Sequence, residues 1–391
     1  MNKKIEPAHR VSDIKEYYFS KKLRELAKLN AAGADIISLG IGGPDKAPAE
    51  EVIFTLQREA AVASNHSYQS YNGLTELRLA FANWYKEKYG VSLNPENEIL
   101  PLIGSKEGVL HISLAFLNPG DGVLVPDPGY PTYTSVSRLV GADIYTYNLT
   151  EEGEWLPDFD ELEKLPLEKI KLMWVNYPNM PTGRRASMET FERLVDFGKR
   201  HGIVIAHDNP YSFILNKEPL SLLQVKGALD VAVELNSLSK SHNMAGWRIG
   251  MAASNPTFIS WILKVKSNID SGQFKPMMLA AAQALKAPQE WYDRLYDLYA
   301  ERREIAEEIM KETGCSFDKE QRGLFLWGKI PENAENGEAL ADELFYNAKV
   351  FVTPGFIFGK NGDRYIRISL CASTDKLKEA LIRIKNYYKT R

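Results

Sequence analysis

The chain has 391 residues, of which 44% are apolar and 25% charged, a composition ordinary for a globular protein. Its net charge of −3, with no long run of one sign, gives no electrostatic reason to expect nucleic acid or a membrane as a partner. The longest apolar stretches, such as 202–206, are far too short to span a bilayer, and the first ten residues lack the apolar core of a secretory signal. Cys315 and Cys371 are too few for a disulfide scaffold, and the histidines show no metal-ligand spacing. We therefore expect a reduced, cytoplasmic protein without a bound metal.

Short β-rich runs alternate with longer helical patterns from about residue 47 to 285. The predicted strands are 99–103, 122–126, 142–147, 171–176, 203–207, 231–236 and 249–253. Helical patterns cover 74–89, 106–117, 188–201 and 256–267. This alternation is typical of an α/β domain in which helices cover both faces of a mostly parallel sheet, here of seven strands. The ligand crevice of such a sheet lies at the carboxyl ends of its strands.

The pattern changes after residue 276. One long helical region is predicted over 279–313, followed by β-like runs at 323–329 and 365–370 and a terminal helix at 376–388. We expect a smaller α+β domain at 286–391 beside a large domain at 47–285. The N-terminal segment 1–46, with a helix near 14–31, is expected to pack on the smaller domain.

The chemically richest stretch is the segment around Lys240, which directly follows the predicted strand 231–236. Burying an unpaired ammonium group is costly, whereas a carbonyl cofactor converts the amine into a Schiff base. An ordinary surface-loop lysine is the alternative. The neighbours favour a cofactor, because Ser237 and Ser239 supply hydroxyl donors and Arg248 can hold a phosphate through two parallel hydrogen bonds.

Ser-x-Ser-Lys followed by Gly-Trp-Arg-x-Gly, with the arginine eight residues after the lysine, resembles the lysine signature of class I/II aminotransferases, which use pyridoxal 5′-phosphate (PLP). The resemblance covers nearly the whole chain. It implies the PLP-dependent transferase fold type I, an internal aldimine on Lys240, and a homodimer with shared active sites. Tyr-Tyr-Phe-Ser at 17–20 and Ile-Ser-Leu-Gly-Ile-Gly-Gly-Pro-Asp at 37–45 are most similar to the branch containing LL-diaminopimelate aminotransferase.

The PLP ring needs a carboxylate beside its nitrogen, because only the protonated ring withdraws electrons strongly. Asp208 follows the apolar run 202–206, and Tyr211 comes three residues later. The resemblance implies that Asp208 pairs with the pyridinium nitrogen and that Tyr211 donates to the ring's phenolic oxygen. An aspartate at a strand end is otherwise more often a turn or capping residue.

Phosphate groups bind well at the N-terminus of a helix. Residues 104–108 follow a predicted strand and form the start of a predicted helix. Ser105 and Lys106 are the expected donors there, beside Arg248 and the two serines that precede the lysine. The resemblance implies that Tyr68 reaches the phosphate of the partner subunit, although an ordinary loop tyrosine remains the alternative.

Three further positions match residues that this family uses around the cofactor ring and the substrate. The resemblance implies that Tyr130 stacks on the cofactor ring, that Arg367 binds the substrate's α-carboxylate, and that Gly42 lets the backbone approach the same carboxylate. Tyr130 and Arg367 have plain alternatives, since proline-rich turns often contain tyrosines and strand arginines usually face solvent.

One residue departs from the family pattern. The usual Asn-Pro-Thr-Gly reads Met180-Pro-Thr-Gly here, and a thioether cannot donate a hydrogen bond to the ring's phenolic oxygen as the asparagine does. Asn179 or Asn176 could replace that donor, or Tyr211 could hold the oxygen alone.

The resemblance implies a ping-pong aminotransferase that moves an amino group between an L-amino acid and a 2-oxo acid. A carbon–sulfur β-lyase on the same fold is the main alternative, because both reactions remove the α-proton. A PLP-binding protein without activity is less favoured, given Lys240, Asp208 and Arg367 together. A PLP-binding transcription regulator would need a DNA-binding domain, for which the resemblance leaves no room.

Overall fold

The computed structural model describes residues 5–12 and 18–390. Its largest element is a seven-stranded sheet with the strand order β2-β8-β7-β6-β5-β3-β4. The strands are β2 (Ile99–Leu102), β3 (Gly122–Asp127), β4 (Asp143–Asn148), β5 (Ile170–Val175), β6 (Val204–Asp208), β7 (Ala232–Ser237) and β8 (Gly250–Ala253). Each lies on one of the predicted strands. All neighbouring pairs are parallel except the two that involve β8, so the predicted mostly parallel sheet is confirmed.

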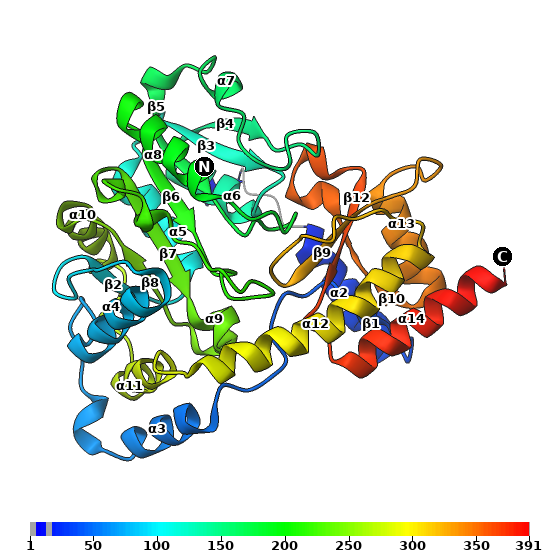
Figure 1. Ribbon diagram of the computed structural model, residues 1–391, viewed down its shortest axis with the longest axis horizontal. Helices are drawn as coiled ribbons and strands as arrows, with labels where there is room; N and C mark the ends of the chain where they lie inside the picture. The colour runs from blue at the N-terminus through cyan, green and yellow to red at the C-terminus, as the bar shows by residue number, and fades with distance from the viewer. Residues whose placement is uncertain (1–4, 13–17, 391) are drawn as a thin grey trace.

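The strands are buried on both faces because successive side chains enter two different cores. In β5, Leu172 and Trp174 point into one core, and Met173 and Val175 into the other. The first core contains α5 (Ser105–Phe116), α6 (Pro131–Val140) and α10 (Pro256–Lys266). The second contains α4 (Thr75–Tyr89), α8 (Met188–His201) and α11 (Lys275–Ala284), with α3 (Glu50–Ala60) against α11. Figure 1 shows the helices on either side of this sheet.

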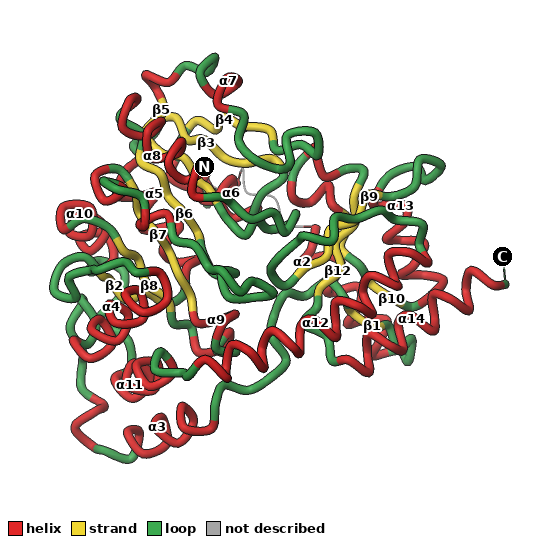
Figure 2. Tube along the Cα trace, viewed as in Figure 1, coloured by secondary structure: helices red, strands yellow, loops and turns green. Residues whose placement is uncertain are grey.

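A smaller sheet and its helices form the rest of the molecule. Its three antiparallel strands have the order β11 (Thr353–Pro354), β12 (Tyr365–Ser369) and β9 (Phe325–Lys329). The helices here are α13 (Gly337–Glu343) and α14 (Thr374–Lys389). Figure 2 shows these strands as a group separate from the large sheet.

The helical region predicted over 279–313 consists of two helices separated by a short connection. The chain leaves α11 at Ala284 and enters α12 (Gln289–Glu312) after Pro288. A proline lacks the N–H needed inside a helix and disfavours helical geometry in the residue before it. The second helix contributes Tyr292 to the core of the large sheet and Ile309 to that of the small one, and Figure 1 shows it running between them.

The N-terminal segment packs on the C-terminal part of the chain. Helix α2 (Tyr18–Ala31) follows the short α1 (His9–Ser12), and residues 14–17 of the predicted helix lie outside the described residues. The apolar face of α2 packs against Phe345 and Phe351. Strand β1 (Ile37–Ser38) then pairs in parallel with β10 (Val350–Phe351). In the described part of the chain, no helix is both long and apolar enough to cross a membrane.

Candidate active site

A cavity of about 800 Å³ lies where the carboxyl ends of β6 and β7 and the N-terminus of α5 face the small sheet. Most of the residues predicted from the sequence line it: Gly42, Ser105, Lys106, Tyr130, Asp208, Tyr211, Ser237, Ser239, Lys240, Arg248 and Arg367. These come from separate stretches of the chain. The position agrees with the rule that parallel sheets bind ligands at the carboxyl ends of their strands.

Asp208 ends β6 and is 4% exposed. Its Oδ2 accepts a hydrogen bond from the hydroxyl of Tyr133 at 3.0 Å, whereas its Oδ1 has no partner in the structure. Burial raises the pKa of Asp208 to about 6, against the lowering effect of the Tyr133 hydrogen bond. A buried carboxylate oxygen without a donor is expensive, so this atom fits a cationic N–H group of a ligand.

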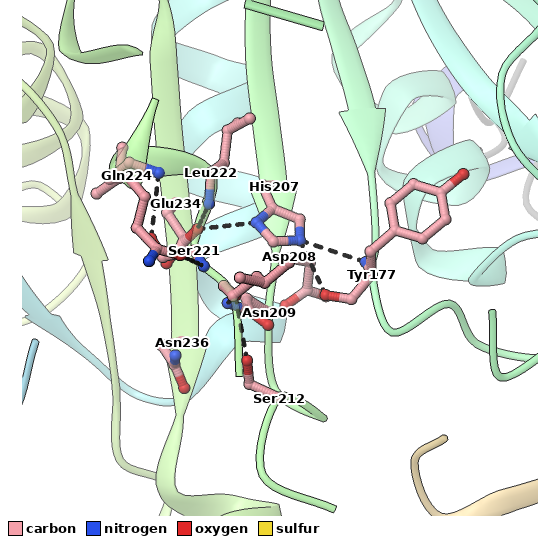
Figure 3. A network of polar contacts seen from close by, with 12 residues as sticks. Tyr177, His207, Asp208, Asn209, Ser212, Ser221, Leu222, Gln224, Glu234 and Asn236 are labelled. Atoms are coloured by element: carbon pink, nitrogen blue, oxygen red, sulfur yellow. Dashed lines mark hydrogen bonds and ion pairs between the residues drawn. The ribbon is translucent and has the colours of Figure 1, made fainter. Parts of the chain in front are cut away.

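A buried polar network includes His207, the residue that precedes Asp208 on β6 (Figure 3). Its centre is the carboxylate of Glu234 on β7, which is fully buried. That carboxylate contacts four groups at 2.8–2.9 Å: the hydroxyls of Tyr85 and Ser221, the backbone N–H of Leu222 and the ring Nδ1 of His207. The Nε2 of His207 lies 3.0 Å from the carbonyl oxygen of Tyr177. The pair therefore links β6, β7 and the loop after β5 directly beside Asp208.

Lys240 lies in the short helix α9 (Leu238–Ser241) that follows β7, and its Nζ donates to the carbonyl oxygen of Gly42. Burial lowers its pKa, and the charges of Arg367 and Arg248 lower it further. A larger fraction of the amine is therefore neutral, which is the form that attacks a carbonyl group. A Cβ atom on Gly42 would clash with the ring of Phe325, so a larger residue at this position would force that ring to move.

The N-terminus of α5 and Arg248 form one positively polarised end of the cavity. Gly104 has a φ of +80°, and a Cβ atom on it would lie 2.5 Å from Nη2 of Arg248. Arg248 is held by the carbonyl oxygens of Ala245 and Ile103, each at 3.1 Å. Together with the hydroxyls of Ser237 and Ser239, this end offers helix N–H groups, hydroxyls and a guanidinium, the donor set that binds a phosphate.

Arg367 lies at the other end, on β12, and is 5% exposed. Its guanidinium lies 3.8 Å from the centre of the Phe325 ring and 4.6 Å from that of Phe358. Nη2 donates to the carbonyl oxygen of Gly40 at 2.9 Å, Nη1 contacts the sulfur of Met180 at 3.1 Å, and Nε has no partner. Burial lowers its pKa to about 10, so it stays charged at neutral pH. It can therefore bind a small carboxylate in a water-poor setting.

Two predicted residues lie outside the cavity lining. Asn179 is buried, but its Oδ1 accepts from the backbone and hydroxyl of Thr182, and its Nδ2 donates to the carbonyl oxygen of Asn176. Of the asparagines considered beside Met180, Asn176 lines the cavity, with its amide engaged by the backbones of Asp208 and Met180. Tyr68 is 91% exposed and lies away from the cavity of its own chain.

Tyr133 is a site residue that the sequence analysis missed. It lies three residues after Tyr130, so both rings lie on adjacent turns at the start of α6, 5.5 Å apart and edge to face. Its ring also stacks on Trp174 of β5 at 5.0 Å. The spacing was visible in the sequence, but only the folded chain brings its hydroxyl to Asp208.

The cavity fits PLP. The orphaned oxygen of Asp208 suits the ring nitrogen, the α5 end suits the phosphate, and the amine of Lys240 suits the aldehyde. Among the described residues, no three His, Cys, Asp or Glu side chains gather as metal ligands. Fold and cavity together define a PLP-dependent transferase of fold type I.

Comparison with known proteins gives the same class. Residues 34–384 match the model of the family "Aminotransferase class I and II". The LL-diaminopimelate aminotransferase of Aquifex aeolicus is 41% identical over 384 residues, covering 98% of this chain and 99% of the relative. A substrate-bound structure of BacF from Bacillus subtilis superposes with a TM-score of 0.93, at 35% identity and 98% coverage of both chains. A probable N-succinyldiaminopimelate aminotransferase from Thermus thermophilus gives 0.88, at 32% identity, covering 94% of this chain and 99% of that one.

The chain belongs to the class I and II aminotransferase family. It uses PLP to transfer an amino group between an amino acid and a 2-oxo acid. The predicted resemblance, including that to the LL-diaminopimelate aminotransferase branch, is confirmed.

Proposed function

We propose that this transamination takes place in the cavity, with Lys240 carrying the cofactor and moving the proton. The observation that carries this proposal is that a partly buried lysine with a lowered pKa shares one cavity with an aspartate oxygen that has no hydrogen-bond partner in the structure. Ser105, Lys106, Ser237, Ser239 and Arg248 are proposed to hold the phosphate. Tyr130 is proposed to cover the ring, and Tyr211 to donate to its phenolic oxygen.

Bound PLP supplies an electron-withdrawing ring that stabilises negative charge at the substrate's α-carbon. Asp208 keeps the ring nitrogen protonated through a charge pair in a buried site. Arg367 orients the substrate through its α-carboxylate, with Gly42 leaving room for it. The neutral amine of Lys240 then takes the α-proton.

Transamination and β-elimination are separated by the fate of the amino group. An L-amino acid added without any oxo acid is expected to remove the cofactor's visible absorption band and release one equivalent of 2-oxo acid per active site. Pyridoxamine phosphate should remain on the protein. Continuous release of pyruvate and ammonia from cysteine or cystathionine, with the band unchanged, would establish the lyase instead.

A homodimer with shared active sites is also part of the proposal. Tyr68 lies outside its own cavity and exposes 91% of its surface, so its hydroxyl is available to a second subunit. Replacing Tyr68 with phenylalanine is expected to weaken PLP retention by about 1.5–3 kcal/mol, the value of one hydrogen bond to a charged group.

Equilibrium dialysis against free PLP measures this loss, and sedimentation at micromolar concentration measures the assembly. Tyr71→Phe is the matched control, because Tyr71 is a nearby tyrosine that is 46% exposed. Equal retention by both variants, or a fully active monomer, would contradict the shared site. A cytoplasmic location is proposed as well, supported by the two buried and unpaired cysteines.

A further inference from the structure

Glu234 has a fully buried carboxylate to which the proposed reaction gives no task. The hydroxyls of Tyr85 and Ser221 both donate to its Oε1. The backbone N–H of Leu222 donates to its Oε2, and Nδ1 of His207 lies 2.8 Å from the same oxygen. Hydrogen bonds accepted by a carboxylate stabilise its charged form. These contacts therefore favour a buried negative charge on β7.

His207 is placed to supply the counter-charge. Among the residues that the structure describes, it is the sole basic side chain that pairs with Glu234. Its Nε2 lies 3.0 Å from the carbonyl oxygen of Tyr177, whereas the N–H of the same residue is farther away, at 3.3 Å. Both ring nitrogens thus face an oxygen that can accept, which suits a doubly protonated imidazolium. A buried carboxylate without such a partner would be costly.

The charge of His207 reaches the next residue of β6, Asp208. Successive side chains leave a strand on opposite faces, so the imidazolium acts on Asp208 through its charge and not through a hydrogen bond. Burial raises the pKa of Asp208, whereas the hydrogen bond from Tyr133 and the charge of His207 both lower it. A positive charge at this place therefore favours the ionised carboxylate that a protonated ring nitrogen needs.

The same imidazole also contacts the loop after β5, which binds the backbone of Asp208. His207 lies against the backbone of Tyr177, and the residue before it, Asn176, donates from Nδ2 to the carbonyl oxygen of Asp208 at 2.6 Å. Figure 3 shows His207 between Glu234 and Tyr177, with Asp208 beside it. The charge pair and the loop therefore form one connected support around Asp208.

We infer that Glu234 and His207 are positioning residues for Asp208: the carboxylate of Glu234 holds His207 as an imidazolium, whose charge keeps Asp208 ionised opposite the ring nitrogen of PLP. Neither is among the described residues that line the cavity, so both act through Asp208 and not on the cofactor directly. The inference rests on the proposed role of Asp208 and extends it to two buried residues behind the site.

The protonation state of the ring nitrogen tests the inference directly. It is measured by solid-state nitrogen-15 NMR of the holoenzyme, reconstituted with PLP that is labelled at the ring nitrogen. Glu234→Gln removes the negative charge that holds the imidazolium and nearly keeps the size of the side chain. This variant is expected to move the signal from the position of a protonated pyridine toward that of a neutral one. Turnover should fall about tenfold, less than for Asp208→Asn, because Asp208 itself remains.

Ser221→Ala is the matched control, because it removes a hydrogen bond to the same carboxylate and leaves the charge of Glu234 in place. This variant is expected to unfold at a lower urea concentration and to keep the ring-nitrogen signal of the wild type. A second variant, His207→Asn, removes the imidazolium itself and is expected to shift the signal in the same direction as Glu234→Gln. The visible band of each purified variant confirms that it has folded around the cofactor.

A ring nitrogen that stays protonated in both Glu234→Gln and His207→Asn would overturn the inference and leave the role of Asp208 intact. A shift in Ser221→Ala as large as that in Glu234→Gln would also overturn it, because the effect would then come from packing and not from charge. A neutral ring nitrogen in the wild-type holoenzyme would instead contradict the proposed role of Asp208.

Discussion

Lys240→Ala is expected to lose turnover by roughly 10⁴-fold, because one substitution removes both the covalent attachment and the proposed proton carrier. The cofactor should still bind, since the groups around its phosphate and ring are untouched. Turnover is measured as 2-oxo acid released. Borohydride reduction of the wild type, followed by peptide mapping, is expected to place the cofactor on the peptide containing Lys240.

Lys106→Ala is the matched control, because Lys106 is a second lysine in the same cavity. This variant is expected to retain PLP less tightly and yet to be labelled by borohydride on Lys240. A cofactor label on Lys106 or any other lysine, or near-normal turnover of Lys240→Ala, would show that the attachment site was misassigned.

Asp208→Asn is expected to lower turnover by about 10³-fold while much of the cofactor affinity remains. An amide cannot hold a proton on the ring nitrogen by charge, so the negative charge that forms at the α-carbon loses its stabilisation. The side chain keeps its size, and its oxygen can still accept from Tyr133. Near-normal turnover in this variant would contradict the electrostatic role of Asp208.

The same substitution is expected to stabilise the protein when PLP has been removed. Folding raises the pKa of Asp208 from 3.8 to about 6, so the folded state favours the protonated form. That advantage is complete below the unfolded pKa and disappears as the pH rises through about 6. Above about pH 6, the ionised Asp208 side chain lowers the free energy of unfolding by about 3 kcal/mol. Urea unfolding of the apoproteins should therefore favour Asp208→Asn at about pH 8, by a margin that shrinks toward about pH 5. A margin independent of pH would contradict the assigned pKa.

The large sheet could be predicted from the sequence because each strand is a short apolar run bounded by turn residues. The run at 203–207, for example, appears as β6, Val204–Asp208. Burial on both faces gives every such strand a nearly continuous apolar pattern. The direction of β8 was not predictable in this way, because an antiparallel strand between two buried neighbours has the same pattern.

The candidate site could be predicted where one sequence motif contains several of its residues. Lys240 and Arg248 belong to such a motif, and the structure places both in the cavity. Tyr133 was missed because its contact with the cavity depends on the packing of distant segments. Asn179 was chosen for its place beside Met180 in the sequence, whereas the turn in which it lies directs its amide to Thr182 and Asn176.

The pairing of β1 with β10 determines when the chain can finish folding. Ile37 pairs with Val350, so the N-terminal segment must wait for more than three hundred further residues to be synthesised. At about 5–20 residues per second, that wait is roughly 15–60 s. Throughout it, the face of α2 that later covers Phe345 and Phe351 has no partner within its own chain. The apolar face of α2 is therefore exposed to chaperones and to aggregation for most of the time that the chain takes to be synthesised.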